Sequence, residues 1–300
     1  MAQVDVVWYG DTNGENHGWW DQTLIKDTIE NSNLESTYYE GIKKLPEYSK
    51  GAIVIVPTRL WTGRETELSD SLQRLGFVLL ILCGDEEATF NWRLIKHVRM
   101  AVWVMMPRMN VHDDTVHIPN GYRPDTRKYL REAGYKEKTQ DWIFAGQVTH
   151  ERREQLVQEL VFLKDSGRYP NGRLETTKTF GEEIIPYKTY VEELVKTKIA
   201  LCPSGPESPD SFRLYEALEA GCLPVVDAFS TNFKTHGFWE YMFGEKPPFP
   251  IVDYWDALPK LMPELLKGYP ENANKCYAWW QKIKYKLVKK LEKDIQELTK

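Results

Sequence analysis

Arg213 and Glu216 are the two residues whose types and spacing indicate the most specific chemistry in this chain. They lie in the segment Lys198–Asp227, KIALCPSGPESPDSFRLYEALEAGCLPVVD. Residues three apart share one side of a helix. Arginine makes charge-assisted contacts to phosphate, and a carboxylate can accept two hydroxyls of a ribose. The pair therefore favours a nucleotide site, and a plain surface ion pair is the alternative that the spacing leaves open.

The loop that precedes this pair has features of an anion-binding site. The apolar run Ile199–Cys202 predicts a strand, and a stretch rich in Pro, Gly and Ser follows it. Asp210 or Ser211 can cap the next helix, and unpaired N–H groups at a helix start bind anions. Ser204 and Phe212 lie in the same loop and helix start, so they join the substrate-binding candidates.

Acid–base candidates follow two other predicted strands. They are Asp11, His17, Asp85 and Glu86. The first two follow Val4–Tyr9, and the last two follow Phe77–Cys83. Burial or charged neighbours can bring such a group to a pKa near neutrality, as a general base requires. Turn formation, loop hydrogen bonding and a charged helix start are the structural alternatives.

The cysteines and histidines do not predict a metal site. Cys83, Cys202, Cys222 and Cys276 include no CxxC pair, and they indicate buried thiols in a reducing compartment. The one metal-like cluster consists of His112, Asp113, Asp114 and His117. It straddles a loop and a strand start, and we do not expect it to bind a metal.

The elements that position these residues alternate between short apolar runs and amphipathic stretches. Continuous Val/Ile/Leu runs are typical of parallel strands covered on both faces, and their alternation with helices predicts a doubly wound α/β fold. The predicted strands are Val4–Tyr9, Ala52–Pro57, Phe77–Cys83, Ala101–Met106, Val116–Pro119, Asp141–Ala145, Leu174–Phe180, Ile199–Cys202 and Leu223–Val226. The predicted helices are Trp20–Ile29, Glu65–Leu75, Glu151–Lys164, Tyr187–Thr197 and Phe212–Ala220.

A turn-rich connection, Ile118–Pro124, divides the chain into two α/β sets. The polar stretch Arg127–Gln140 follows it. We predict an N-terminal, acceptor-side domain of residues 1–125 and a donor-binding domain of residues 126–278. Residues 279–300 form a C-terminal helix that we expect to pack back on the first domain.

The net charge of −5 excludes a generic polyanion binder. Residues 279–300 nevertheless hold seven Lys against three acidic residues. Their apolar stripe predicts a packed helix with a solvated basic face, and contact with a membrane or nucleic acid is the alternative. We expect a cytoplasmic protein with no transmembrane segment, because no apolar run reaches about 20 residues and no signal-peptide pattern is present.

The segment Lys198–Asp227 resembles the C-terminal signature of GT-B glycosyltransferases, in particular the exostosin-like family. The shared pieces are Leu201-Cys-Pro203, Ser211-Phe-Arg213, Glu216-Ala217 and Gly221-Cys-Leu-Pro-Val225. Two further pieces resemble the start of that family's second domain and its interdomain link. They are Ile143-Phe-Ala-Gly146 followed by Arg152 and Arg153, and Ile118-Pro-Asn-Gly-Tyr122. The first 110 residues match only in their α/β character.

The resemblance implies two Rossmann-like domains facing a cleft, with a nucleotide-sugar donor held by the second. Glu216 would bind the donor ribose. The residues that would bind the diphosphate are Ser211, Arg213 and one of Arg152 or Arg153. Related retaining families place a Glu eight residues before the ribose Glu, where this chain has Ser208. The resemblance therefore implies inverting transfer with no metal, and with the nucleotide sugar as co-substrate in place of a cofactor.

We expect a hexosyl- or pentosyltransferase that moves a sugar from a nucleotide diphosphate sugar to an acceptor hydroxyl. The acceptor is a polysaccharide, a lipid-linked glycan or a hydroxylated DNA base. The base would come from the first domain. A nucleotide-sugar epimerase of the same fold and a non-catalytic glycan- or nucleotide-binding module are the alternatives.

Overall fold

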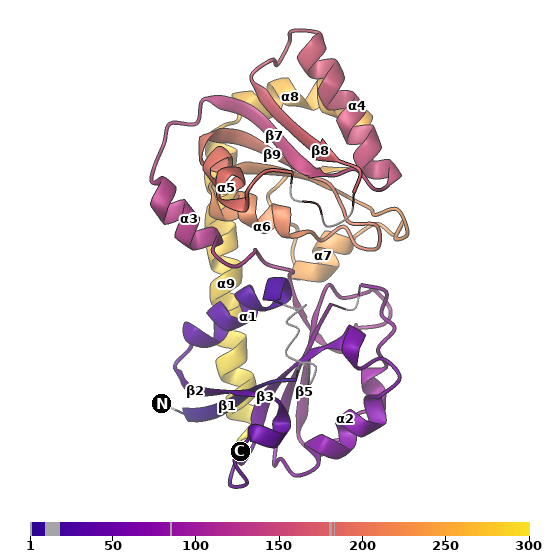
Figure 1. The fold of residues 1–300 in the computed structure, drawn as a ribbon, viewed down its shortest axis with the longest axis vertical. Coiled ribbons are helices and arrows are strands. Elements are labelled where there is room, and N and C mark those ends of the chain that lie inside the picture. The colour runs from indigo at the N-terminus through magenta and orange to yellow at the C-terminus, as the bar shows by residue number, and fades with distance from the viewer. Residues whose placement is uncertain (1, 10–18, 85, 180–181, 183) are drawn as a thin grey trace. The chain divides into compact units, whose positions relative to one another are not determined.

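The structure is a computed structural model of the 300-residue chain that describes residues 2–9, 19–84, 86–179, 182 and 184–300. The chain forms two compact units (Figure 1). The first comprises Met1–Asn120 and Ile283–Lys300, and the second comprises Gly121–Lys282. Each unit is built on its own sheet.

The first unit has a six-stranded sheet in the order β2-β1-β3-β4-β5-β6, and all its neighbouring strands are parallel. The strands are β1 (Ala2–Trp8), β2 (Leu34–Glu40), β3 (Ala52–Pro57), β4 (Val78–Cys83), β5 (Met100–Met105) and β6 (Val116–Ile118). The helices are α1 (Trp19–Glu30), α2 (Glu65–Leu72) and the C-terminal part of α9 (Glu271–Leu298). Short 3-10 turns span Ile42–Lys44, Thr58–Leu60 and Trp92–Leu94.

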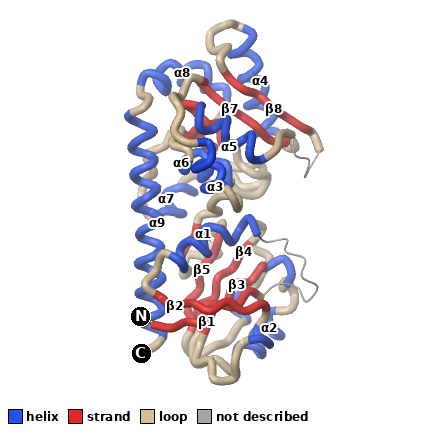
Figure 2. The backbone as a smooth tube through the Cα atoms, turned by 60° about the vertical axis from the view of Figure 1, so that its left-hand side comes forward, coloured by secondary structure: helices blue, strands red, loops and turns tan. Residues whose placement is uncertain are grey.

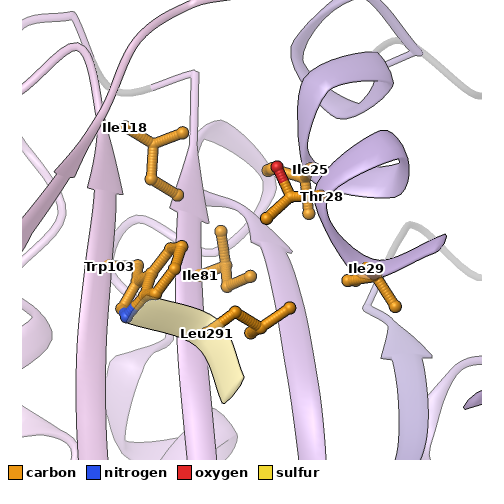
Figure 3. A pocket seen from close by; sticks show the side chains of 7 residues that line it. All are labelled: Ile25, Thr28, Ile29, Ile81, Trp103, Ile118 and Leu291. Atoms are coloured by element: carbon orange, nitrogen blue, oxygen red, sulfur yellow. The ribbon is translucent and has the colours of Figure 1, made fainter. Parts of the chain in front are cut away.

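The apolar runs of the central strands bury both faces of this sheet. Val54 and Leu80 belong to a core cluster with Leu72 of α2. Ile81, the next residue of β4, faces α1 and Leu291 of α9 around a cavity of about 10 Å³ (Figure 3). Neighbouring residues of a strand point to opposite faces, so a strand covered on both sides needs an uninterrupted apolar run.

Helix α9 contributes to both units. In the first, the buried Asp294 accepts a hydrogen bond from Nε1 of Trp103 at 2.8 Å. In the second, Nε1 of Trp280 donates to Oε1 of Glu219 at 2.7 Å. The lysines of α9 form the ion pairs Lys275–Glu271, Lys282–Glu245, Lys289–Glu292, Lys290–Asp294 and Lys293–Glu297. Four of the seven lysines in residues 279–300 are thus paired with carboxylates, three of which belong to the same segment.

The second unit has a five-stranded parallel sheet in the order β11-β10-β9-β7-β8. Its strands are β7 (Gln140–Gln147), β8 (Gly172–Thr177), β9 (Thr197–Cys202), β10 (Leu223–Asp227) and β11 (Ile251–Val252). Its helices are α3 (Thr126–Ala133), α4 (Glu151–Asp165), α5 (Tyr187–Lys196), α6 (Phe212–Glu219), α7 (Phe238–Phe243) and α8 (Leu258–Lys267), with a 3-10 turn at Trp255–Ala257.

Helices cover both faces of this second sheet. Helices α4 and α8 pack together on one face, and α3, α5 and α6 lie together on the other (Figures 1 and 2). The two parallel, doubly wound sheets confirm the predicted α/β class with two Rossmann-like domains. The arrangement of those domains around a cleft stays a prediction.

Some elements differ from those that the sequence predicts. Strand β2 is absent from the prediction because its residues are polar or partly exposed, as suits an edge strand that pairs only with β1. Helix α3 forms within the stretch predicted as a polar connection, and α9 begins at Glu271 rather than near Trp279. None of the helices in the described ranges combines the length and apolar composition that crossing a membrane requires.

Candidate functional site

In the second sheet, β7 is the strand at which the chain order reverses. β8 follows β7 along the chain and lies on one side of it, and β9 lies on the other side. Ligands of open α/β sheets bind beyond the carboxyl ends of the strands at such a reversal. The residues at this edge come from the end of β7, from the loop between β9 and α6, and from the end of β10.

Arg213, in the first turn of α6, lies at this reversal. Its Nε donates to the carbonyl oxygen of Ala145 in β7 at 2.9 Å, and the residue is only 9% exposed. Gly146 leaves the space that the guanidinium occupies, because a Cβ there would lie 2.6 Å from Nη2 of Arg213. Among the described residues no carboxylate forms an ion pair with Arg213. The arginine therefore brings an unneutralised positive charge to this edge of the sheet.

Glu216 lies one turn farther along α6 and is fully buried. Its Oε1 accepts a hydrogen bond from the hydroxyl of Tyr187 at 2.8 Å, whereas its Oε2 finds no partner in the described part of the chain. Burial raises the pKa of Glu216 to about 7, and the Tyr187 hydrogen bond, the charges of Arg213 and Arg123 and a hydrogen bond from the backbone of Arg123 oppose this rise. A buried acceptor without a partner costs folding free energy, and a ligand hydroxyl would satisfy it.

One buried hydroxyl at the same edge also lacks a hydrogen-bond partner among the described residues, that of Ser211, before α6. The buried hydroxyl of Ser204, after β9, hydrogen-bonds to Asp227 and opposes the rise in pKa that burial causes in that carboxyl. Ser211 occupies the N-cap position with extended backbone, but its side chain does not cap the helix. The carboxylate of Asp210 accepts the hydroxyl of Tyr215. The Ser211 hydroxyl at the start of α6 is therefore available to a ligand, and the N–H groups of a helix start favour an anion.

Arg152 is engaged inside the fold. Its guanidinium pairs with the buried carboxylate of Asp227 and donates to the carbonyl oxygen of Asp253 at 2.8 Å. Asp227 also accepts a hydrogen bond from the backbone N of Ser204 at 2.8 Å. The charge of Arg152 is thus neutralised, and the pair fixes the start of the loop that carries Ser204. The sequence pattern does not predict this partner.

Arg153 and His150 hold the same loop from the start of α4. Arg153 donates from Nε to the carbonyl oxygen of Ser204 at 3.1 Å and from Nη1 to that of Gln147 at 3.0 Å. The ring of His150 contacts the Ser204 carbonyl oxygen through Nε2 at 3.1 Å and the Thr231 hydroxyl through Nδ1 at 3.2 Å. Burial, followed by the charge of Arg153, lowers the pKa of His150 to about 4. The neutral ring therefore donates from Nε2 and accepts at Nδ1.

His150 is a site residue that the sequence reasoning missed. Its only local signal is its position between the end of β7 and the two arginines in the first turn of α4. Phe212, by contrast, is among the predicted residues, and the Cζ atom of Arg213 lies 5.1 Å from the centroid of its ring. The aromatic ring thus packs beside the arginine at the start of α6.

The acid–base candidates belong to the first unit. Asp11, His17 and Asp85 lie outside the described residues, so their roles stay predictions. The fourth candidate, Glu86, is described, and its carboxylate pairs with the guanidinium of Arg59 at 3.5 Å. That pair is partly exposed, with the Arg59 side chain 73% accessible.

The residues of the metal-like cluster make local contacts. Nδ1 of His112 accepts from the backbone N of Arg108, Asp113 accepts from that of Asn110, Asp114 pairs with Arg93, and His117 contacts the carbonyl oxygen of His112. Among the described residues, no group of three or more His, Cys, Asp and Glu is placed to hold a metal ion. All four cysteines are buried and free of disulfides, as the sequence predicted.

Comparison with known proteins identifies the family. The family model described as RXYLT1 C-terminal domain matches residues 143–298, more than half of the chain. This range contains α4, α6 and the loop between β9 and α6. The chain belongs to this glycosyltransferase family. No curated protein matches the chain.

Among solved structures, the crystal structure of an α1,3-fucosyltransferase with GDP is similar to this chain. The sequence identity is 9% and the TM-score is 0.44, and the match covers 92% of this chain and 81% of that one. The fold assignment rests on the strand order of the two sheets and not on this likeness.

Proposed function

We propose that the protein transfers a sugar from a nucleotide diphosphate sugar to an acceptor hydroxyl, with inversion and without a metal ion. One observation carries this proposal. At the carboxyl edge of β7 and β9, Arg213 has no ion-pair partner, and Oε2 of Glu216 and the hydroxyl of Ser211 have no hydrogen-bond partners among the described residues. Buried polar groups are normally satisfied, so a cluster of unsatisfied ones supports a bound ligand.

The chemistry of these groups matches a nucleotide diphosphate. Arg213, the start of α6 and the Ser211 hydroxyl would bind the diphosphate and stabilise its charge as it leaves. Arg153 would contribute a second positive charge. Glu216 would accept the ribose hydroxyls through its unsatisfied oxygen. Family membership supports a transferase over a plain nucleotide-binding module.

The other half of the reaction belongs to the first unit. An inverting transfer needs a base that deprotonates the acceptor hydroxyl, and we propose that Asp11, His17 or Asp85 supplies it. Ser208, at the position where related retaining enzymes have Glu, supports inversion. The resemblance to exostosin-like enzymes, the cytoplasmic location and the acceptor (a polysaccharide, a lipid-linked glycan or a hydroxylated DNA base) are parts of the same proposal.

Donor turnover tests the reaction class. The protein is incubated with UDP-xylose, UDP-glucose, UDP-N-acetylglucosamine and GDP-mannose, and the products are followed by chromatography. UDP-xylose is included because the matched family is one of xylosyltransferases. We expect slow release of free nucleotide from one of them. Conversion into an isomeric nucleotide sugar would instead identify an epimerase, and binding without any conversion would identify a binding module.

The Arg213→Ala variant tests the site. We expect the affinity for the nucleotide sugar to fall by about tenfold to a hundredfold, because hydrogen bonds to charged groups contribute about 1.5–3 kcal/mol. Arg173→Ala is the matched control, since Arg173 lies in the same unit but pairs with Glu175 and Glu193. Unchanged donor affinity in Arg213→Ala would show that the site assignment is wrong.

A further inference from the structure

The two carboxylate oxygens of Glu216 have different surroundings. Oε1 accepts the hydroxyl hydrogen of Tyr187 at 2.8 Å, from the first turn of α5. Oε2 is buried without a partner among the described residues. The backbone of Arg123 also hydrogen-bonds to this carboxylate. A carboxylate held by such contacts presents its unpartnered oxygen in a fixed direction. Sequence spacing gives no sign of this contact, because the two residues are 29 positions apart.

Tyr187 is itself held from the α3 side. The hydroxyl of Thr126 lies within hydrogen-bond distance of the Tyr187 hydroxyl. The guanidinium carbon of Arg123 lies 4.0 Å from the centroid of the Tyr187 ring, and the ring of Tyr129 meets it edge-on at 5.9 Å. Figure 2 shows the three helices α3, α5 and α6 beside one another. The contacts of Arg123 and Tyr129 therefore hold the Tyr187 ring in place beside Glu216.

The proton state of Glu216 depends on the same contacts. The groups that face it are Tyr187 and Tyr190 from α5, Arg213 from its own helix and Arg123 from the segment before α3. Burial raises its pKa to about 7, and the Tyr187 hydrogen bond is the first of the effects that lower it. Near neutral pH, the hydroxyl of Tyr187 thus favours the ionised form, which accepts two hydrogen bonds from a diol.

We propose that Tyr187 is a positioning residue for donor recognition: it orients Glu216 so that Oε2 binds the ribose hydroxyls of the nucleotide. This inference rests on the proposed function, because it takes Glu216 as the ribose ligand. The site then selects ribonucleotide over 2′-deoxyribonucleotide donors, since a deoxy donor leaves a buried acceptor unsatisfied.

The Tyr187→Phe variant tests this role. It keeps the ring that Arg123 and Tyr129 contact and removes only the hydroxyl. Its matched control is Tyr190→Phe, which removes a neighbouring hydroxyl that makes no hydrogen bond to Glu216 among the described residues. Affinities for the four nucleotide sugars of the turnover panel and for their 2′-deoxyribose counterparts are measured calorimetrically from about pH 5.5 to 8.5. The doubly esterified diphosphates do not titrate in this range.

We expect the wild-type protein to bind the ribose donor more tightly as the pH rises through about 7, because the ionised form of Glu216 is the acceptor. In Tyr187→Phe we expect the midpoint of this pH dependence to move higher, the affinity at pH 7 to fall about tenfold, and the preference for ribose over deoxyribose to shrink by a similar factor. Tyr190→Phe should resemble the wild type in its ribose preference.

Two different results would overturn the two proposals separately. If Tyr187→Phe lowers the affinity equally at every pH and for both sugars, or leaves it unchanged, the hydroxyl does not position Glu216. If the wild-type protein binds none of the nucleotide sugars, the proposed function fails first. If the wild-type protein binds them without preferring ribose, Glu216 is not the ribose ligand, and the role inferred for Tyr187 fails as well.

Discussion

The carboxyl edges of the two sheets have the same topology and different chemistry. In each sheet the first strand in the chain, β1 or β7, lies between its two successors, so each has a reversal of strand order. In the second unit, Arg213, Glu216 and Asp227 are buried at that edge. Among the described residues of the first unit, Arg59 lies beside the strand ends, is 73% exposed and pairs with Glu86. The fold alone therefore does not make a ligand site.

The two edges also differ in the free-energy cost of burying their charged groups. An exposed ion pair contributes little to folding, and its loss is cheap. A buried carboxylate or guanidinium costs free energy unless partners compensate it. In the second unit, the burial of Glu216 lowers the folding stability. A ligand that hydrogen-bonds to this group would stabilise the folded protein. The buried, unsatisfied oxygen of Glu216 and the exposed, paired guanidinium of Arg59 favour the second unit as the donor-binding one.

The largest expected effect comes from Asp227→Ala. This substitution leaves the buried guanidinium of Arg152 without its carboxylate and removes the acceptor of the Ser204 backbone N–H. Breaking a buried pair by removing one partner costs about 3–5 kcal/mol. We expect the free energy of unfolding in urea to fall by about that amount. A loss below about 1 kcal/mol would mean that this edge resembles the exposed one in the first unit.

The next effect concerns Glu216→Gln and pH. With a pKa of about 7 in the folded state against 4.5 in the unfolded state, the native protein holds a proton that the unfolded chain loses between these values. The stability that Glu216 contributes therefore falls as the pH rises through this window. We expect Glu216→Gln to be about 3 kcal/mol more stable than the wild type at pH 8 and within about 1 kcal/mol of it at pH 5.

The comparison in that experiment must be between the two proteins at each pH. His150 acts in the opposite direction, because its pKa is lowered from 6.5 to about 4, so the stability that it contributes is lost as the pH falls through this window. Both proteins contain His150, so its contribution cancels in the difference. A difference that does not grow with pH would show that Glu216 is not a buried, raised-pKa carboxylate.

A smaller effect is expected from Gly146→Ala. The added Cβ would lie 2.6 Å from Nη2 and 3.0 Å from Cζ of Arg213, so the guanidinium must move. Because a flexible side-chain end can shift, we expect a stability loss of only about 1 kcal/mol but a donor affinity about tenfold weaker. Gly172→Ala is the contrasting control, since its Cβ would meet the ring of Trp142 at 1.9 Å and affect stability rather than affinity. Equal donor affinity in Gly146→Ala and the wild type would contradict the placement of Arg213.

The smallest effect is expected at the first unit's edge. Arg59→Ala removes an exposed ion pair with Glu86 and a hydrogen bond to the carbonyl oxygen of Gly84. We expect the free energy of unfolding to change by less than about 1 kcal/mol, and nucleotide-sugar affinity to stay within about twofold. A large loss of donor affinity in this variant would assign part of the donor site to the first unit.

The fold was largely predictable because its central strands are covered on both faces. The runs Ala52–Pro57 and Phe77–Cys83 are continuously apolar, and this pattern is typical of strands that are buried on both faces. Strand β2 escaped prediction because an edge strand needs no such run, and its sequence LESTYYE mixes exposed and partly buried residues. Helix α8 is also absent from the predicted helices, because Pro263 lies within its span and proline is unfavourable inside a helix.

The candidate site was predictable only where it is local in sequence. The spacing of Arg213 and Glu216 on one helix identified the second unit's edge. The partners that define their chemistry come from far along the chain: Tyr187 is 29 residues from Glu216, and the carbonyl of Ala145 is 68 residues from Arg213. The Asp227 partner of Arg152, 75 residues away, could not be inferred from local spacing either.

A crystal structure of the protein with the nucleoside diphosphate of whichever donor it binds, UDP or GDP, tests the proposed donor site most directly. We predict that the diphosphate lies at the start of α6 against Arg213 and Ser211, with the ribose hydroxyls at Oε2 of Glu216. A nucleotide bound on the first unit, or on the second unit away from the end of β7, would contradict it.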